Sequence, residues 1–303
     1  MNSKSEIIKL LFVISLLLTF LEAKTYKIGF AQDTLSNDWR KAQADQLIYY
    51  SKKYNFLELT ISDAKGSVAN QIAAIEKFIK EDYDFIITSP INASITSVVL
   101  KKAVDKGIKV ILLSRGINSD HYTSFIAPDN YKIGQEAAKY LLNKMNYQGT
   151  VLMLQGLEGT TSSTLREKGF EDIAKNYENI KIIKVRGNYL RNDTIKALED
   201  VYEKGIKFDA IYSHSDSMAA GAKIVIEKKD NKKIPIIGID YIKEAKESIL
   251  SGKQLASFIY PTAAKEGIET IVSIIEGKEV AKNQTIETVL VDKNNVMKIE
   301  PIF

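Results

Sequence analysis

The chain has 303 residues, with 42 basic and 38 acidic side chains and a formal net charge of +4. It contains no cysteine and only two histidines, which excludes disulfides and leaves too few ligands for a zinc or transition-metal cluster. The lysines are spread along the predicted helices, so no nucleic-acid partner is expected.

The first element in chain order is an apolar run near the N-terminus. Lys4 and Lys9 precede the uncharged segment Leu10–Leu21, which reads LLFVISLLLTFL. This pattern predicts a secretory signal peptide over residues 1–23, cleaved near Ala23, although Leu21 is larger than the usual residue at its position. An uncleaved anchor is the alternative, but the run is shorter than the roughly 20 residues of a membrane span. Without a cysteine for lipid attachment, we expect a free protein in the periplasm.

A first series of strands and helices follows the signal peptide. Short runs rich in Val, Ile and Phe alternate with helical patterns, as in parallel strands buried on both faces. The predicted strands are 26–31, 56–61, 85–88 and 110–113, and the predicted helices are 38–53, 68–80 and 95–106.

The pattern then restarts in the second half of the chain. The predicted strands here are 150–154, 181–185, 210–212 and 234–239, and the predicted helices are 164–177, 194–204 and 218–229. Repeated βα units predict the α/β class, with two doubly wound parallel sheets in two lobes. About 280 residues after the signal also exceed the size of a single core.

Ligands bind open parallel sheets beyond the carboxyl ends of the strands, so the residues after each strand are the candidate site. These segments are polar and rich in arginine, and they are 32–40, 89–91, 114–115, 156–166, 188–191, 213–216 and 240–241.

Several stretches in the same regions carry a family resemblance. They are Ile28-Gly-Phe-Ala-Gln with Asp38-Trp-Arg, Ile111-Leu-Leu-Ser-Arg-Gly, Ile126-Ala-Pro-Asp-Asn with Gly134, Leu154-Gln-Gly, Leu165-Arg-Glu-Lys-Gly-Phe, Tyr212-Ser-His-Ser-Asp-Ser-Met-Ala-Ala-Gly-Ala, Ile237-Gly-Ile-Asp and Ala256-Ser-Phe-Ile-Tyr-Pro. The chain resembles the type I periplasmic sugar-binding proteins, the group of ribose- and galactofuranose-binding proteins. The resemblance covers the whole mature chain, and Trp39-Arg40 looks most like the galactofuranose branch.

The resemblance implies two lobes joined by a three-segment hinge. The crossings are expected near 127–130, 257–262 and 284–286. The first lobe would then comprise 24–127 plus 261–283, and the second 128–260 plus 284–303. Closure of such lobes around a ligand is a hinge motion.

Arginines and aromatic residues form one part of the expected ligand site. Arg115 directly follows a buried strand, and in the family the corresponding arginine contacts sugar. The alternative for Arg115 is a pair with a carboxylate. The alternatives for Trp39, Arg40, Arg166 and Tyr189 are a core tryptophan, a surface arginine, a helix ion pair and a loop tyrosine, respectively. The expected ligand-binding residues of this kind are Trp39, Arg40, Arg115, Arg166, Tyr189, Arg191 and Tyr260.

Hydroxyl and carboxyl acceptors form the other part. Asp240 ends an apolar strand, where the family aspartate accepts sugar hydroxyls. Ser114 and Ser215 are included in the site, but they depart from the family, which commonly has aspartate and asparagine there. Asp216 is expected to be a helix N-cap. Two missing acceptors beside retained arginines favour an acidic sugar or another small anion, because arginine suits carboxylate and phosphate.

The sequence therefore predicts a monomeric solute-binding protein that delivers a sugar or sugar-like ligand to an inner-membrane ABC transporter. The alternative is a periplasmic sensor that presents the bound form to a histidine kinase or chemoreceptor. No cofactor, metal or catalytic residue is expected. A glycoside hydrolase would need two carboxylates across the cleft, and only Asp240 is well placed for that.

Overall fold

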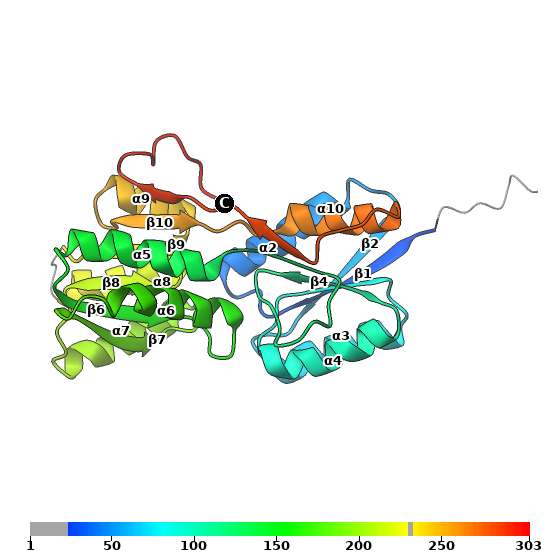
Figure 1. Ribbon diagram of the computed structural model, residues 1–303, viewed down its shortest axis with the longest axis horizontal. Coiled ribbons are helices and arrows are strands. Elements are labelled where there is room, and N and C mark those ends of the chain that lie inside the picture. The colour runs from blue at the N-terminus through cyan, green and yellow to red at the C-terminus, as the bar shows by residue number, and fades with distance from the viewer. Residues whose placement is uncertain (1–23, 230–232) are drawn as a thin grey trace, which may run out of the picture.

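The structure is a computed structural model that describes residues 24–229 and 233–303. The predicted signal peptide at residues 1–23 lies outside the described residues. Within the described ranges, no helix is long and apolar enough to cross a membrane. Two lobes lie end to end along the long axis, and the chain crosses between them in the middle (Figure 1).

The first lobe is built on a six-stranded sheet. All of its neighbouring strands pair in parallel, and apolar side chains of β1, β3 and β4 are buried, as the Ile- and Val-rich runs predict. In spatial order the strands are β11 (Asn283–Ile286), β5 (Ser124–Pro128), β4 (Lys109–Leu113), β3 (Phe85–Thr88), β1 (Tyr26–Gln32) and β2 (Leu57–Asp63).

The second lobe repeats this arrangement with one difference. Its edge strand β12 runs antiparallel to β10, while the remaining pairs are parallel. In spatial order the strands are β12 (Leu290–Asp292), β10 (Ala256–Ile259), β9 (Ile236–Asp240), β8 (Ala210–Ser213), β6 (Gly149–Gln155) and β7 (Ile180–Arg186). The prediction of two doubly wound α/β lobes is confirmed.

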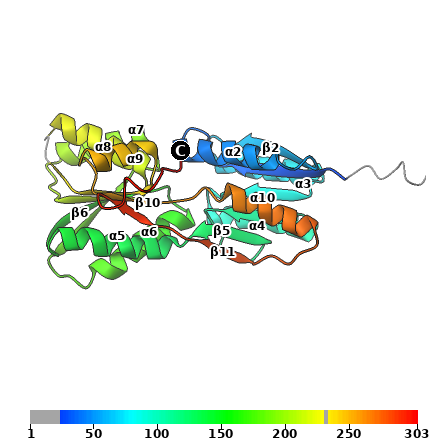
Figure 2. The ribbon, with the colours of Figure 1, turned by 90° about the horizontal axis from the view of Figure 1, so that it is seen from above.

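Helices cover both faces of each sheet. In the first lobe α2 and α10 pack together on one face and α3 and α4 on the other (Figure 1); in the second, α5 and α6 lie opposite α7, α8 and α9 (Figure 2). Their bounds are α2 (Asp38–Ser51), α3 (Val68–Lys80), α4 (Ala93–Asp105), α5 (Asn130–Lys144), α6 (Thr161–Ala174), α7 (Arg191–Glu203), α8 (Asp216–Lys229), α9 (Lys243–Leu250) and α10 (Ala264–Ile275).

Three segments cross between the lobes. The first joins β5 to α5 and the second joins β10 to α10, in the regions expected. The third requires a correction, because 284–286 was expected as the crossing itself. The backbone of Asn283–Ile286 instead pairs with β5 as β11, the edge strand of the first sheet. The crossing therefore lies between Ile286 and Leu290.

The packing of α5 on α6 is unusually close and positions part of the site. A Cβ on Gly134 of α5 would lie 2.3 Å from the backbone oxygen of Arg166, and one on Gly169 of α6 would lie 2.1 Å from that of Tyr131. Only glycine allows the two backbones to touch in this way. The contact brings the first turn of α5 against the Arg166 side chain.

Candidate ligand-binding site

A cavity of about 290 Å³ lies between the lobes, lined by residues that follow strands of both sheets. This volume is near the lower end of the roughly 300–1,000 Å³ usual for small-molecule sites. The structure brings together nine of the expected site residues, which are Trp39, Arg40, Ser114, Arg115, Arg166, Tyr189, Ser215, Asp240 and Tyr260.

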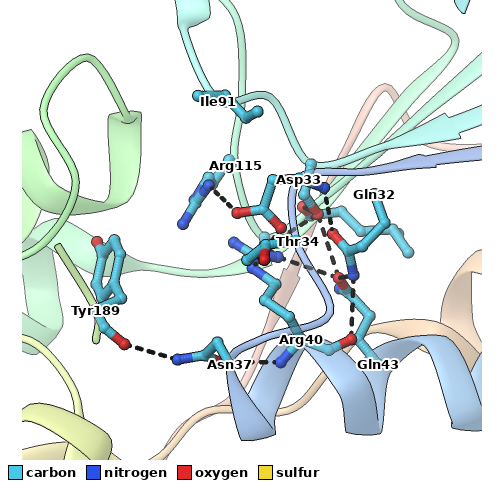
Figure 3. A network of polar contacts seen from close by, with 12 residues as sticks. Gln32, Asp33, Thr34, Asn37, Arg40, Gln43, Ile91, Arg115 and Tyr189 are labelled. Carbon is cyan, nitrogen blue, oxygen red and sulfur yellow. Dashed lines mark hydrogen bonds and ion pairs between the residues drawn. The ribbon is translucent and has the colours of Figure 1, made fainter. Parts of the chain in front are cut away.

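Asp33 is the centre of the first lobe's contribution (Figure 3). Its Oδ2 lies 2.7 Å from Nη1 of Arg115, and its Oδ1 lies 3.2 Å from Nε of Arg40. All three side chains are at most 7% exposed. A single buried carboxylate thus pairs with two guanidinium groups contributed by segments far apart in sequence.

The start of α2 is fixed by a network of amides. Gln32 Oε1 accepts from the backbone N–H of Asp33, while Gln32 Nε2 donates to the carbonyl of Arg40 and to Gln43. Gln43 in turn accepts from Arg40 Nη1 and donates to the carbonyl of Thr262 in the second crossing. The Arg40 side chain is therefore held in place without a ligand.

Ser114 lies beside this ion pair. Its Oγ accepts from Arg40 Nη1 at 3.1 Å, and its backbone has a φ of 62°, in the left-handed region. The serine hydroxyl thus belongs to the arginine network, and the next residue, Arg115, projects from the carboxyl end of β4 toward Asp33.

Arg166 of α6 is the main donor of the second lobe. Its Nε donates to Oδ1 of Asn130 at 2.8 Å, and its Nη1 donates to the backbone carbonyl of His214. The guanidinium also lies 4.4 Å from the ring centre of Tyr260. The close α5–α6 contact makes the first of these bonds possible, since Asn130 is the first residue of α5.

Asp240 supplies the second lobe's acceptor. It ends β9 with a φ of 123°, a conformation rarely adopted by residues other than glycine. Burial raises the pKa of its carboxyl well above the ordinary value, opposed by the positive charge of Arg166. The backbone N–H of Asp216 is its hydrogen-bonding partner from the protein. Strain and burial at an acceptor that lines a cavity favour a role in ligand binding.

Asp216 supports this strand end from behind. Its carboxylate accepts from the N–H of Tyr241, the hydroxyl of Ser257 and the amide of Gln254, at 2.6–2.8 Å. Burial raises its pKa to about 6. Asp216 is the first residue of α8 and not the N-cap that was expected, and its carboxylate has a structural role. The cap is Ser215, whose hydroxyl accepts from the Met218 N–H and which also lines the cavity.

Aromatic rings form much of the apolar wall. Tyr189 packs against Gly156, where a Cβ would lie 2.0 Å from its ring carbon, and Arg115 lies 5.2 Å from its ring centre. Trp39 donates its indole N–H to the carbonyl of Tyr260 at 2.8 Å. The Tyr260 hydroxyl donates to the carbonyl of Ser114 and accepts from Asn130, so it bridges the lobes.

The lobes also touch at the mouth of the cavity. Asn37 Nδ2 donates to the Tyr189 carbonyl at 2.7 Å (Figure 3), and the Ala93 N–H donates to the Gly159 carbonyl at 3.1 Å. The Gly116 N–H donates to Oγ1 of Thr161. The lobes are therefore in contact beside the cavity, which lies between them.

Arg191 is a correction to the expected site. It does not line the cavity; its guanidinium pairs with Glu244 of α9, and both side chains are more than one-third exposed. The nearby acidic partner explains this position. Conversely, Asp33 was overlooked as a single residue although its segment was expected to line the site. Its partner Arg115 is distant in sequence, so no local pattern marks the pair.

The cleft combines charged donors, carboxylate acceptors and aromatic faces. Ligand hydroxyl groups both donate and accept, so they can bridge arginines to carboxylates, and C–H faces can pack on rings. Among residues 24–229 and 233–303, no group of three His, Asp or Glu side chains is suited to a metal ion. The fold and the cleft together define a class of protein: a hinged, two-lobed α/β protein that encloses a small polar molecule.

Comparisons with known proteins identify the family within this class. The sequence matches the periplasmic binding protein domain over residues 28–279, so the chain belongs to the periplasmic binding protein family. It is 30% identical to the galactofuranose-binding protein of Escherichia coli (strain K12), covering 76% of each chain. It is 26% identical to the ribose import binding protein of Bacillus subtilis (strain 168), covering 86% of this chain and 85% of that protein.

Solved structures agree with this assignment. The fructose-binding periplasmic domain of a hybrid two-component system superposes with a TM-score of 0.85 at 29% identity, covering 90% of this chain and 92% of that one. A galactofuranose-binding protein gives a TM-score of 0.84 at 26% identity, covering 90% and 96%.

Proposed function

We propose that this chain is an exported, monomeric periplasmic protein that captures a sugar or sugar-like ligand in the cleft and delivers it to an ABC transporter. The observation that carries the proposal is the cavity between the lobes, in which Asp240 and Asp33 lie among three buried guanidinium groups and the aromatic rings. The similar proteins named for galactofuranose and ribose support a sugar as the ligand class.

The geometry suits capture and release better than chemical conversion. A ligand that contacts Arg115 and Asp240 at once would join the two lobes and stabilise the closed form. Opening about the three crossings would then break contacts on one side only and release the ligand. Such closure is driven by the difference in ligand affinity between the open and closed states.

A sensory role is the second candidate, and one observation favours it. The similar fructose-binding domain belongs to a hybrid two-component system, so closely related folds present sugars to signalling partners. The cleft would serve both roles equally, because the proposed transporter and the proposed signalling protein would each bind the closed, ligand-bound form.

Thermal unfolding of the mature protein tests the sugar proposal. The panel comprises D-ribose, D-xylose, D-fructose, L-arabinose and D-galactose, with matched sugar acids and phosphates. A ligand at 100 times its dissociation constant should stabilise the folded state by about 2.7 kcal/mol. No stabilisation by any sugar or sugar derivative would contradict the proposal.

The choice between delivery and sensing needs the cell. In a strain lacking this gene, loss of uptake of the radiolabelled sugar ligand would support delivery to a transporter. Unchanged uptake with lost sugar-dependent transcription would support sensing instead.

A further inference from the structure

Asp33 occupies an unusual position within the site. Its carboxylate lines the cavity, yet it is the shared partner of Arg40 and Arg115 from the same lobe. Figure 3 shows Arg115 lying between Asp33 and the ring of Tyr189 from the opposite lobe. A negative charge is thus already built into the place where two arginines converge.

The arginines have few forked donor pairs left for an anion. The Nε of Arg40 is in an ion pair with Asp33, and its Nη1 donates to Gln43 and Ser114. Arg166 gives Nε to Asn130 and Nη1 to the His214 carbonyl. Two parallel N–H groups on one guanidinium are what carboxylates and phosphates require for bidentate binding.

Arg115 is the exception, because only its Nη1 is paired. That bond goes to Asp33, and the Nε of Arg115 is buried without a hydrogen-bond partner. The carboxylate of Asp33 therefore limits which ligands the remaining N–H donors of Arg115 can bind. With this carboxylate in place, an acidic ligand would meet a fixed negative charge at close range.

We propose that Asp33 is the charge-selective residue of the cleft: by holding the anion position between Arg40 and Arg115, it makes the site accept ligand hydroxyls and reject acidic ligands. This inference rests on the proposed function and adds a residue and a selection rule to it. It also reverses the expectation of an acidic ligand, which counted the arginines without their internal partner.

The backbone suggests how the same charge can be moved. Ser114 Oγ lies 3.1 Å from Arg40 Nη1, so a carboxylate at position 114 could pair with Arg40 directly. The φ of 62° at Ser114 is in the left-handed region, which aspartate tolerates better than most residues. The charge can therefore be removed at one position and restored at another.

Calorimetric titration with matched ligands provides the test. The pairs are D-galactose with D-galacturonate, D-glucose with D-glucuronate, and D-ribose with ribose 5-phosphate. The unchanged protein should bind a neutral member more than about tenfold more tightly than its acidic partner. Asp33→Asn and Asp33→Ser should weaken binding of the neutral sugar and shift this ratio toward the acid by about tenfold to a hundredfold.

Two further variants keep the test sharp. Glu244→Gln removes a carboxylate that also pairs with an arginine, Arg191, but lies outside the cavity lining, so the ratio should stay unchanged. The double variant Asp33→Ser/Ser114→Asp should regain preference for the neutral sugar. Urea unfolding of each ligand-free variant shows that it is folded.

The outcomes separate this inference from the function itself. If the unchanged protein binds a uronate or sugar phosphate more tightly than the neutral partner, the role of Asp33 is overturned while the sugar-binding function stands. An unchanged ratio in both Asp33 variants also overturns it. If no sugar of either kind binds, both proposals fail.

Discussion

The two lobes contribute to the cleft in different ways. The first lobe presents an ionic network, in which Asp33 pairs with both Arg40 and Arg115 and two glutamines fix the start of α2. The second lobe presents an acceptor, Asp240, held on a strained strand end. The first surface should keep its arrangement in the open form, since its partners lie on one lobe. The second depends on a buried polar shell behind it.

This difference teaches where affinity and stability are coupled. Changes in the first lobe's network should act mainly on which ligand is bound. Changes in the second lobe's shell should act on folding as well, because buried groups there would lose their partners.

The largest effect is expected from Arg166→Met in the second lobe. The change leaves Asn130 Oδ1 and the His214 carbonyl without their donor and removes the positive charge that faces Asp240. Urea unfolding should show a loss of about 3–5 kcal/mol, together with loss of sugar binding. The control is Arg191→Met, whose exposed pair with Glu244 should cost at most about 1 kcal/mol and leave binding intact. Equal losses of stability and of sugar binding in Arg166→Met and Arg191→Met would contradict the special role of the buried arginine.

The pH dependence of stability should reveal the carboxylate behind Asp240. Burial raises the pKa of Asp216 to about 6 in the folded state, so the folded protein holds this proton more tightly than the unfolded chain. The stabilisation that protonated Asp216 gives the folded state is fully present below the pKa of an aspartate in the unfolded chain, near 4. It is lost as the pH rises through 6. The unfolding free energy of the unchanged protein minus that of Asp216→Asn should fall by up to about 3 kcal/mol between pH 4 and pH 7. A difference that is constant across this range would argue against a titrating Asp216.

Gly156→Ala tests the aromatic wall of the second lobe. The added Cβ would lie 2.0 Å from a ring carbon of Tyr189, so the ring has to move toward the cavity. Sugar affinity should fall about tenfold by calorimetry. Gly116→Ala is a matched change in the first lobe, because its Cβ would meet Phe125 at an ordinary 3.5 Å, and its affinity should be unchanged. A larger loss of sugar affinity in Gly116→Ala than in Gly156→Ala would contradict the assignment of the aromatic wall to the second lobe.

The smallest effect is expected from Asn37→Asp at the mouth of the cavity. Asn37 caps α2 by accepting from the Arg40 N–H, and it donates across the cleft to the Tyr189 carbonyl. Aspartate keeps the cap but replaces the donor with a charged oxygen, so the bond between the lobes becomes a repulsion from the Tyr189 carbonyl. Affinity should fall about two- to tenfold, with unfolding free energy unchanged. Asn37→Ala should lose stability as well, because it also loses the cap. If Asn37→Asp loses as much stability as Asn37→Ala, the bond to Tyr189 stabilises the fold itself and not only the closed form.

The sequence predicted the regions of the site better than its individual contacts. Arg115 and Asp240 were expected because both follow apolar strands, and parallel sheets bring those ends to one edge. The structure places both in the cavity. Asp33 was not singled out, because its importance comes from an ion pair with a residue 82 positions away. Arg191 follows β7 as expected, yet its guanidinium turns to Glu244, a partner that strand order does not reveal.

The lobe boundaries show the same limit. Periodicity located four strands in each lobe but missed β5, β10, β11 and β12, of which β11 is a short edge strand with mixed polar and apolar residues. Its assignment depends on the free edge of β5, which only the folded sheet provides. The third crossing was therefore expected at 284–286, within β11, whereas it follows that strand.

Trp39 gives the molecule a built-in optical probe. It is the sole tryptophan of the chain. Its backbone lies in the first turn of α2 in the first lobe, but its ring packs in the apolar core of the second lobe. Its N–H is bonded to the second crossing, and the guanidinium of Arg40 lies 4.8 Å from its ring centre. Any rotation of one lobe against the other changes the polarity around this indole. The intrinsic fluorescence of the unlabelled protein can thus report opening and closing in real time, without a dye or an engineered cysteine.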